Sequence, residues 1–475
     1  MRSAFGGIPE MAEPTVLRMG PLDIPQWLLV KYATSGPRYT SYPTAPQFKS
    51  DFSEARILED WHGTNACGRK GLSLYLHVPF CQSRCLYCGC FTETGHGAET
   101  VERYVAALLK EAGRIRTIID PSRRVELLAL GGGTPTFLQP EQMRALVDGL
   151  AARFQFAPDS ERSIEVDPRR IDAGYLDLLL GLGFNRISFG VQDLDEQVQR
   201  NVARVLPEQK LVALIEHLRN RDFNAINLDL MYGLPGQTEA SFRRTIDRII
   251  ALAPSRIALF GYAHVPWVSP QQQALEKLGL PGPAERTRLF GLAFRLLLDA
   301  GYSHIGMDHF AWRHDELIRA LENRSLTRNF MGYSTRRGLD LVGIGASAIS
   351  SVDGTYAQNE KSLEAYLRKA GGSTWIKGLR LSSEDLLRRE IILDLFCNFY
   401  LDVARIEQQF GLEFNRHFAR ELDQLALMEA DGLLRMHDSK IQVSDLGRFF
   451  IRNICMCFDQ YLSGESRQVS YSRTV

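Results

Sequence analysis

The chain has 475 residues, equal numbers of basic and acidic side chains, and a hydrophobic fraction of 45%. This length and balance predict a globular enzyme with one large and one smaller domain, and the lack of a basic excess argues against nucleic-acid binding. No apolar run reaches the length of a membrane span, no secretory pattern opens the chain, and the clustered cysteines predict a reduced, cytoplasmic protein.

The N-terminal stretch changes character twice before the first strong pattern. Residues 1–20 contain Gly and Pro without periodicity, so we expect a flexible or loosely docked arm. Asp23 and Pro25 then predict the N-cap and first turn of a short helix that continues to Val30. Residues 35–45, S-G-P-R-Y-T-S-Y-P-T-A, carry two prolines and predict an extended segment, which composition alone would make a linker.

Between residues 72 and 260, short apolar runs alternate with amphipathic helical patterns. We expect strands over residues 72–77, 125–130, 163–166, 186–191, 225–230 and 256–260. We expect helices among them over residues 101–118, 140–152, 210–221 and 239–253. Repeated strand–helix units predict an α/β fold, a partial (β/α)6 TIM-like barrel with helices outside a parallel sheet. Ligands of such folds bind at the carboxyl ends of the strands, so functional motifs should follow the strands directly.

A dense group of cysteines follows the first predicted strand. Four of the eight cysteines lie here, namely Cys81, Cys85, Cys88 and Cys90. Three thiolates spaced C-x3-C-x2-C can hold three irons of a [4Fe–4S] cluster and leave the fourth iron open, as catalysis requires. A fourth ligand would close that position, so we place Cys90 outside the ligand set. Structural zinc sites usually split their ligands into two distant pairs, and disulfide frameworks belong to small secreted chains.

Further motifs stand at or near the ends of later strands. The run G-G-G-T-P, residues 131–135, would let the backbone approach a ligand closely, although such a turn is more often only a tight loop. Glu165 ends the third strand, where it could bind ribose hydroxyls or an ammonium or simply face solvent, and Gln192 follows the fourth strand. Asp229 lies inside an apolar strand, which is unfavourable for an unpaired carboxylate, and we expect Arg204 to be its partner.

The string H-V-P-F-C-x3-C-x2-C-G-C, residues 77–90, resembles the radical S-adenosylmethionine (SAM) superfamily. Within that superfamily it resembles one family, the oxygen-independent coproporphyrinogen III oxidases of haem biosynthesis. The resemblance runs from about residue 25 to the C-terminus and is carried by residues 35–45, 301–310, 329–333, 356–359 and 452–459. In that family the segment matching residues 35–45 covers the active site.

The resemblance implies a [4Fe–4S] cluster held by Cys81, Cys85 and Cys88, and two bound SAM molecules. The residues that match positions lining the SAM pockets of the family are Tyr75, Tyr87, Gly132, Gly133, Thr134, Glu165, Gln192, Arg204, Asp229, Ala263 and Ile349. On composition alone, Ala263 and Ile349 would be core residues.

The resemblance also implies a reaction. A reduced cluster cleaves SAM to methionine and a 5′-deoxyadenosyl radical, which takes a hydrogen atom from the β-carbon of a substrate propionate. Loss of CO2 and one electron then leaves a vinyl group, and two such steps convert coproporphyrinogen III to protoporphyrinogen IX. We expect a monomer that receives electrons from a reductase or a flavodoxin-like donor. Because the substrate carries four propionates, arginines should bind it, and Arg38 is our candidate for one contact.

From about residue 381 the pattern becomes mainly helical, over residues 384–399, 403–409, 414–430 and 446–461, with a short strand at 441–443. We therefore expect an arm over the active site (1–45), a radical SAM catalytic domain (46–375) and a helical, winged-helix-like domain (376–475). Frequent Asp and Glu residues in the last domain disfavour DNA binding and favour a role in closing over the substrate. We expect Cys455 and Cys457 to be packed thiols, and we assign no role to His77 and His309.

Three positions depart from the family pattern, namely Phe91, Ala129 and Trp312. They bear on substrate fit and turnover more than on cluster binding. Three alternative functions share some of these features: a radical SAM methyltransferase that opens the haem ring, a haem-binding chaperone with a cluster but no decarboxylation, and a purely structural iron–sulfur or zinc protein. The C-G-C string and residues 35–45 favour the oxidase over the chaperone.

Overall fold

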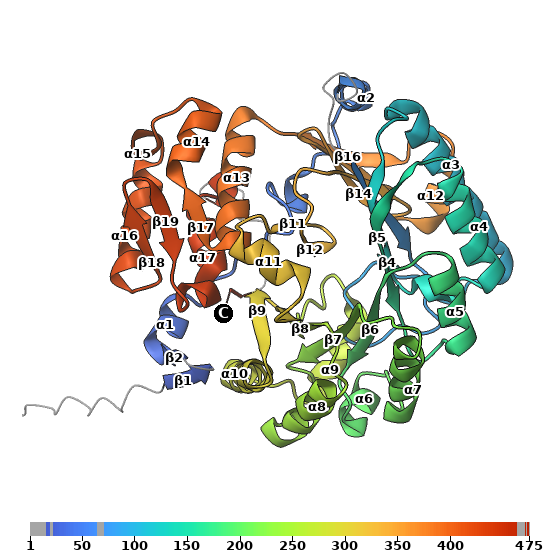
Figure 1. Ribbon diagram of the computed structural model, residues 1–475, viewed down its shortest axis with the longest axis horizontal. Coiled ribbons are helices and arrows are strands. Elements are labelled where there is room, and N and C mark those ends of the chain that lie inside the picture. Colours follow the sequence, from blue (N-terminus) through green and yellow to red (C-terminus); the bar gives the residue numbers. More distant parts are fainter. Residues whose placement is uncertain (1–15, 20–21, 64–70, 463–470, 472, 475) are drawn as a thin grey trace, which may run out of the picture.

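The computed structural model describes residues 16–19, 22–63, 71–462, 471 and 473–474, and Figure 1 shows its architecture. One sheet of 12 strands runs through it in the order β16-β15-β14-β13-β3-β4-β5-β6-β7-β8-β10-β9. The strands from β13 through β3 to β8 pair in parallel. Their bounds are β3 (Leu72–Val78), β4 (Val125–Gly132), β5 (Phe156–Val166), β6 (Arg186–Gln192), β7 (Ile226–Tyr232), β8 (Arg256–Gly261) and β13 (Asp340–Ile344).

The helices that follow these strands lie along the outer side of the curved sheet (Figure 1). They are α3 (Ala98–Ile118), α4 (Pro140–Ala151), α5 (Ala173–Gly181), α6 (Glu196–Asn201), α7 (Glu208–Arg219) and α8 (Glu239–Ala251). Local chemistry sets their ends: α8 begins where the Thr238 hydroxyl accepts a hydrogen bond from the Ser241 N–H at 3.1 Å. The predicted strand–helix alternation is therefore confirmed, and the fold is α/β with a parallel core.

The sheet is wider than the six strands predicted from the sequence. A seventh parallel strand, β13, pairs with β3, and antiparallel strands extend both edges. They are β14 (Ile349–Val352), β15 (Thr355–Asn359) and β16 (Trp375–Arg380) at one edge, and β9 (Tyr302–Gly306) and β10 (His309–Trp312) at the other. These strands are only four to six residues long, too short for their alternation of polar and apolar residues to be distinctive.

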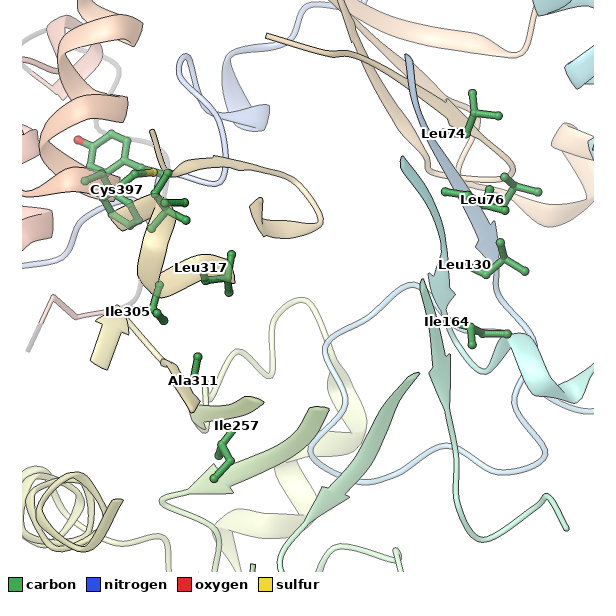
Figure 2. Close-up of a cluster of buried hydrophobic side chains, with 14 of the residues drawn as sticks. Leu74, Leu76, Leu130, Ile164, Ile257, Ile305, Ala311, Leu317 and Cys397 are labelled. Atoms are coloured by element: carbon green, nitrogen blue, oxygen red, sulfur yellow. The ribbon is translucent and has the colours of Figure 1, made fainter. Parts of the chain in front are cut away.

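Successive side chains of the parallel strands point to opposite faces of the sheet, one toward the hydrophobic core and the other toward a cavity. Figure 2 shows Leu74 and Leu76 of β3 among the fully buried residues of the core, with Leu130 of β4 and Ile164 of β5 nearby. The intervening Tyr75 points to the opposite face of the sheet and lines a large cavity there. The apolar face under the helices thus holds the sheet together, while the inner face is free to carry polar side chains.

The N-terminal expectations are partly wrong. Residues 16–19 are not a structureless arm, because β1 (Val16–Met19) pairs with β2 (Leu22–Pro25) in an antiparallel hairpin; residues 1–15 and 20–21 of the predicted arm lie outside the described residues. Helix α1 (Gln26–Lys31) is present, and Pro25 is its N-cap. Asp23, predicted as the cap, instead lies in β2, opposite residue 18 in the backbone register of the hairpin.

The C-terminal part is mainly helical, but two predicted helices are interrupted. Its elements are α13 (Ser383–Asn398), β17 (Tyr400–Asp402), α14 (Val403–Phe410), α15 (Phe414–His417), α16 (Ala419–Ala430), β18 (Leu434–His437), β19 (Lys440–Val443) and α17 (Ile451–Met456). The predicted helix 414–430 breaks at Phe418, whose ring packs against Phe414 and Phe458. The predicted helix 446–461 shortens to α17, which follows a 3-10 turn over Gly447–Phe450. Gly447 packs directly on the carbonyl of Leu433, where a Cβ would lie 1.8 Å away.

The remaining elements connect or cover the sheet. They are α2 (Glu54–Gly63), α9 (Gln273–Glu276), α10 (Pro283–Asp299), α11 (Glu316–Glu322), α12 (Leu363–Lys369) and the hairpin of β11 (Thr327–Asn329) and β12 (Gly332–Ser334). Across the ranges described, every helix is too short or too polar to cross a membrane.

Candidate active site

A cavity of about 1240 Å³ runs along the inner face of the parallel sheet. The structure brings every residue predicted from the sequence as a cofactor or metal ligand to its wall. They are Tyr75, Cys81, Cys85, Tyr87, Cys88, Gly132, Gly133, Thr134, Glu165, Gln192, Arg204, Asp229, Ala263 and Ile349. Residues far apart in sequence therefore share one site, and their individual roles as ligands stay predictions.

The cysteine loop leaves the end of β3 and crosses the carboxyl ends of the neighbouring strands. Its course is set by backbone hydrogen bonds from Cys81 N to Glu93 O at 2.9 Å and from Leu86 N to Val202 O at 3.1 Å. The Sγ of Cys81 lies 3.4 Å from the hydroxyl of Thr134, the residue that follows the three glycines. The loop thereby places its thiols beside the second glycine-rich motif.

The three thiols of the cysteine loop lie close enough to influence one another. Burial raises the pKa of Cys81, and the charges of Cys88 and Cys85 raise it further, so the three groups lie within electrostatic reach of one another. Yet in the described part of the chain no three Cys, His, Asp or Glu side chains converge as they would around one metal ion. A [4Fe–4S] cluster does not need such convergence, because each thiolate binds a different iron. Cys90 lines the same cavity, so its exclusion from the ligand set stays a prediction.

Two arginines surround Cys85 with positive charge. Arg204 Nη1 lies 3.5 Å from the Sγ of Cys85, and Arg169 Nη2 lies 3.9 Å from it. Asp167 holds both arginines, accepting a hydrogen bond from Arg169 at 2.7 Å and lying 3.5 Å from Arg204. Burial disfavours the charge of Arg204, but Tyr87, Asp167 and Cys85 more than offset this and raise its pKa. Such cations suit a site that must hold several thiolates.

The predicted pairing of Asp229 with Arg204 is wrong. Asp229 accepts hydrogen bonds from Asn227 Nδ2 at 2.7 Å and from Ser188 Oγ at 3.1 Å, whereas the ion pair of Arg204 is with Asp167. Neutral neighbours on β6 and β7 thus satisfy the carboxylate, which removes the need for a direct cation partner. Burial raises the pKa of Asp229 to about 6, against the lowering effect of these hydrogen bonds and, at longer range, of Arg204.

Glu165 is the second carboxylate of this region. It accepts a hydrogen bond from the Gly132 N–H at 3.2 Å, and burial, followed by the charge of Asp229, raises its pKa to about 7. On the next strand, Gln192 adopts a positive φ of 71°, and its Oε1 is buried without a hydrogen-bond partner. Glu165, Asp229 and Gln192 therefore each offer polar atoms to a ligand in the cavity.

The glycine run lies partly inside β4 and is required by the protein's own packing. A Cβ on Gly132, which has a φ of +117°, would lie 2.6 Å from the ring of His77. A Cβ on Gly133 would lie 2.3 Å from the carbonyl oxygen of Pro79. His77 itself bridges Tyr75 OH at 3.1 Å and Phe91 O at 3.0 Å, and burial lowers its pKa to about 4, which makes it a neutral structural group.

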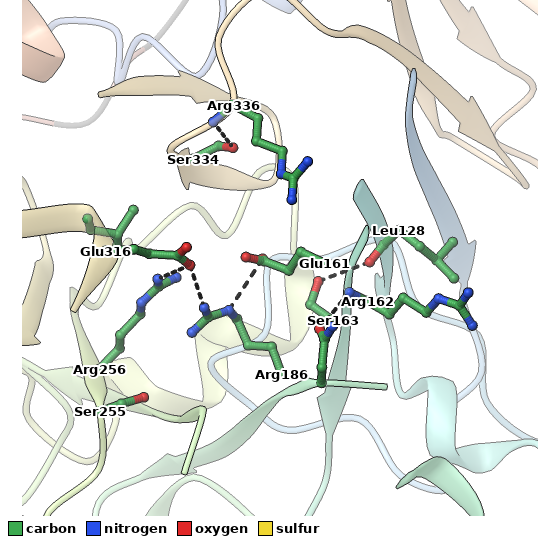
Figure 3. Close-up of polar contacts among 12 residues, drawn as sticks. Leu128, Glu161, Arg162, Ser163, Arg186, Ser255, Arg256, Glu316, Ser334 and Arg336 are labelled. Carbon is green, nitrogen blue, oxygen red and sulfur yellow. Dashed lines mark hydrogen bonds and ion pairs between the residues drawn. The ribbon is translucent and has the colours of Figure 1, made fainter. Parts of the chain in front are cut away.

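The floor of the cavity carries ion pairs that were not predicted from the sequence (Figure 3). Arg186, at the start of β6, lies 3.3 Å from Glu161 and 2.8 Å from Glu316. Arg256, at the start of β8, lies 3.0 Å from Glu316 and 2.8 Å from Asp315. Both strands begin with Arg-Ile, a repeat that could have identified these residues. These pairs lie at the amino-terminal ends of β6 and β8, opposite the strand ends from which the cysteine loop and the glycine run extend.

Comparisons with known proteins match both parts of the chain. The family model of the radical SAM superfamily matches residues 75–249, and that of the HemN C-terminal domain matches residues 381–450. The oxygen-independent coproporphyrinogen III oxidase of Escherichia coli is 43% identical over 451 residues, covering 94% of this chain and 98% of the relative. That of Pseudomonas aeruginosa is 40% identical over 461 residues, covering 96% and 100%. The solved structure of the E. coli enzyme, described as a radical SAM enzyme, has a TM-score of 0.87 at 42% identity and covers 92% of this chain and 98% of its own.

Proposed function

The chain belongs to the family of oxygen-independent coproporphyrinogen III oxidases, radical SAM enzymes of haem biosynthesis, and we propose that the cavity on the inner face of its sheet is where this reaction occurs. When bound, a [4Fe–4S] cluster and SAM supply a 5′-deoxyadenosyl radical that accepts a hydrogen atom from the β-carbon of a propionate. The propionate then loses CO2 and passes one electron to an acceptor, leaving a vinyl group; two such steps yield protoporphyrinogen IX. The methyltransferase, chaperone and structural alternatives have no observation in their favour.

Cys81, Cys85 and Cys88 hold three irons of the cluster, and Arg204 and Arg169 stabilise the thiolate of Cys85. The observation that carries this assignment is the position of the two guanidinium groups, 3.5 and 3.9 Å from Sγ of Cys85. Arg204 and Arg169 share one carboxylate, that of Asp167, which balances only one of their two buried positive charges. Cluster-bound thiolates supply the missing negative charge.

Two SAM molecules bind at the cavity wall. Glu165, Asp229 and Gln192 hydrogen-bond the polar atoms of the nucleoside or the amino acid moiety, since each presents an oxygen to the cavity. Equilibrium dialysis of the cluster-loaded protein with labelled SAM should give two molecules bound for each chain. A stoichiometry of one would exclude the second site.

The electron donor is a reductase or a flavodoxin-like protein, because the reaction begins with one-electron reduction. The monomeric state and the cytoplasmic location predicted from the sequence stay predictions.

The test of the whole assignment is anaerobic. The protein is reconstituted with iron and sulfide, reduced with dithionite, supplied with SAM and coproporphyrinogen III, and followed by product mass and CO2 release. Stepwise loss of two carboxyl groups is expected, and Cys85→Ser should abolish it. SAM cleavage without decarboxylation would contradict the substrate assignment, and absence of a cluster would contradict the assignment of the cysteine loop.

A further inference from the structure

Arg38 is a partly buried arginine on the cavity wall with spare hydrogen-bonding capacity. The residues lining the cavity include seven arginines and four carboxylates. Four of the arginines donate hydrogen bonds through two or more nitrogens, namely Arg84, Arg169, Arg204 and Arg256. Arg186 donates through Nη2 to Glu316, and Arg170 is exposed. Arg38 uses only Nη2, which forms an ion pair with Asp308, and its other nitrogens have no partner in the ranges described. Arg38 is therefore a cation that can still bind an anion.

The backbone on both sides of Arg38 is fixed by the C-terminal part of the chain. Arg452 Nε donates to Pro37 O at 2.9 Å, and the hydroxyl of Tyr39 donates to Asp459 Oδ2 at 3.0 Å. Tyr39 is only 3% exposed, so its ring is fully packed. The position of Arg38 is thus set before any ligand arrives.

Asp308 orients the guanidinium from behind. It lies in the turn between β9 and β10, and its backbone oxygen accepts a hydrogen bond from Leu259 N at 2.6 Å, which ties the turn to β8. The side chain of Asp308 is 11% exposed and that of Arg38 is 34% exposed. The carboxylate is therefore covered while the more exposed guanidinium lines the cavity, so Asp308 fixes the orientation in which Arg38 meets a ligand.

Two aromatic side chains beside Arg38 are incompletely hydrogen-bonded. His309, next to Asp308, lines the cavity, and its ring packs on Phe260 and on Tyr333 of the β11–β12 hairpin. The Nδ1 of His309 and the hydroxyl of Tyr333 are both buried without a hydrogen-bond partner in the described structure. Burial and then the charges of Arg328, Arg38 and Arg256 hold the pKa of His309 well below its usual range. Three arginines thus act on the imidazole, and of these Arg38 is already paired with Asp308. An anion bound beside these cations would be stabilised.

We propose that Arg38, oriented by Asp308 and flanked by His309 and Tyr333, binds a propionate carboxylate of the tetrapyrrole substrate. This inference rests on the proposed function and adds a substrate contact to it. A planar guanidinium matches a carboxylate in a two-point hydrogen bond, and a partly buried, pre-oriented one loses little freedom on binding. Arg38 is the binding residue and Asp308 a positioning residue.

The first experiment measures binding without turnover. Coproporphyrin III, the stable oxidised form of the substrate ring with four propionates, is titrated into the full-length protein and followed by its fluorescence. Arg38→Gln should weaken binding about 10- to 100-fold, the range expected for losing a charge-assisted hydrogen bond. Arg38→Lys should retain part of the affinity. Arg170→Gln removes another cavity arginine, one that is exposed, and should change the affinity less than about twofold. Equal losses from Arg38→Gln and Arg170→Gln would show a general charge effect and overturn the proposal.

A second measurement separates positioning from binding. Asp308→Asn should weaken coproporphyrin binding in the wild-type background but cause no further loss in the Arg38→Gln background, because it acts through Arg38. Additive losses would overturn the positioning role. Turnover distinguishes this inference from the proposed function: KM for coproporphyrinogen III should rise in the reconstituted Arg38→Gln enzyme, whereas the proposed function fails only if the wild-type enzyme releases no CO2. Wild-type affinity and wild-type KM in Arg38→Gln would overturn the inference and leave the proposed function intact.

Discussion

The guanidinium of Arg204 lies 3.5 Å from the Sγ of Cys85 and 3.5 Å from the carboxylate of Asp167. These residues come from separate turns of the barrel, and the contact joins the cysteine loop after β3 to the segment after β6. A single buried cation thereby connects the thiol that should bind iron with the wall that should bind SAM.

Replacing Arg204 tests this connection. Arg204→Met should lower the rate of 5′-deoxyadenosine formation about 10- to 100-fold, because a charge-assisted hydrogen bond contributes roughly 1.5–3 kcal/mol. It should also make the cluster harder to reduce, because a positive charge is lost beside a thiolate ligand. The matched control is Arg200→Met, which removes an exposed arginine paired only with Glu196 on α6. A wild-type rate and potential in Arg204→Met would show that the contact has no role in the cluster.

The cysteines can be told apart by serine substitution. Cys85→Ser should lose the [4Fe–4S] signal and nearly all SAM cleavage, because one of only three iron ligands is removed. Cys90→Ser should keep its iron and sulfide content and stay within about twofold of wild type, since we place it outside the ligand set. Iron and sulfide analysis with electron paramagnetic resonance measures both. Loss of the cluster in Cys90→Ser would make it a ligand and remove the open iron.

Glu111 of α3 should be a major contributor to stability. This fully buried carboxylate accepts hydrogen bonds from the side chains of Tyr366, Asn359 and Thr374, and from the Gly345 N–H at 2.9 Å. It thus holds the segment after β13 that continues to Ile349 on the cavity wall. Glu111→Gln places an amide among these donors and should lower the free energy of unfolding by about 2–4 kcal/mol.

Urea unfolding measures this change, and Glu102→Gln, an exposed position on the same helix, is the control. We also expect Glu111→Gln to weaken SAM binding, because the loop it holds would loosen. If Glu111→Gln and Glu102→Gln have the same free energy of unfolding, Glu111 does not stabilise the segment that leads to Ile349 on the cavity wall.

His77 should make the apo-protein sensitive to acid. Burial lowers its pKa from 6.5 in the unfolded chain to about 4 in the native state. The unfolded chain therefore binds a proton over a pH range in which the native protein does not, and the free energy of unfolding falls as the pH is lowered from 6.5 to about 4. For this one group the loss approaches about 3 kcal/mol.

The comparison needs a variant that does not titrate. In His77→Asn, urea unfolding between pH 4 and pH 7 should show a shallower pH dependence than wild type, by an amount up to this figure. Other buried histidines, such as His304, titrate in both proteins and cancel in the difference. Parallel curves for the two proteins would show that His77 is already protonated, or fully hydrated, in the native state.

Local patterns in the sequence were sufficient for the repeating part of the fold. The six parallel strands and four of the helices between them were predicted because each depends on a short-range pattern of apolar residues. Helices α5 and α6 were not predicted. The cysteine spacing likewise identifies a cluster-binding loop, since three ligands from one loop need no knowledge of distant parts of the chain. Strands as short as β9 and β10 lack enough residues for such a pattern.

The tertiary structure alone decided which distant side chains meet. Asp229 could be judged unfavourable when unpaired from its place in an apolar strand, but its partners proved to be Asn227 and Ser188, not Arg204. The contact of Arg38 with Asp308 spans 270 residues, and that of Arg186 with Glu316 spans 130. Periodicity and capping are set by neighbours a few residues away, whereas the identity of a charge's partner depends on how strands and loops pack in space. The sequence therefore determined the chemistry available to this protein, and the packing of the chain decided which groups share each part of the cavity.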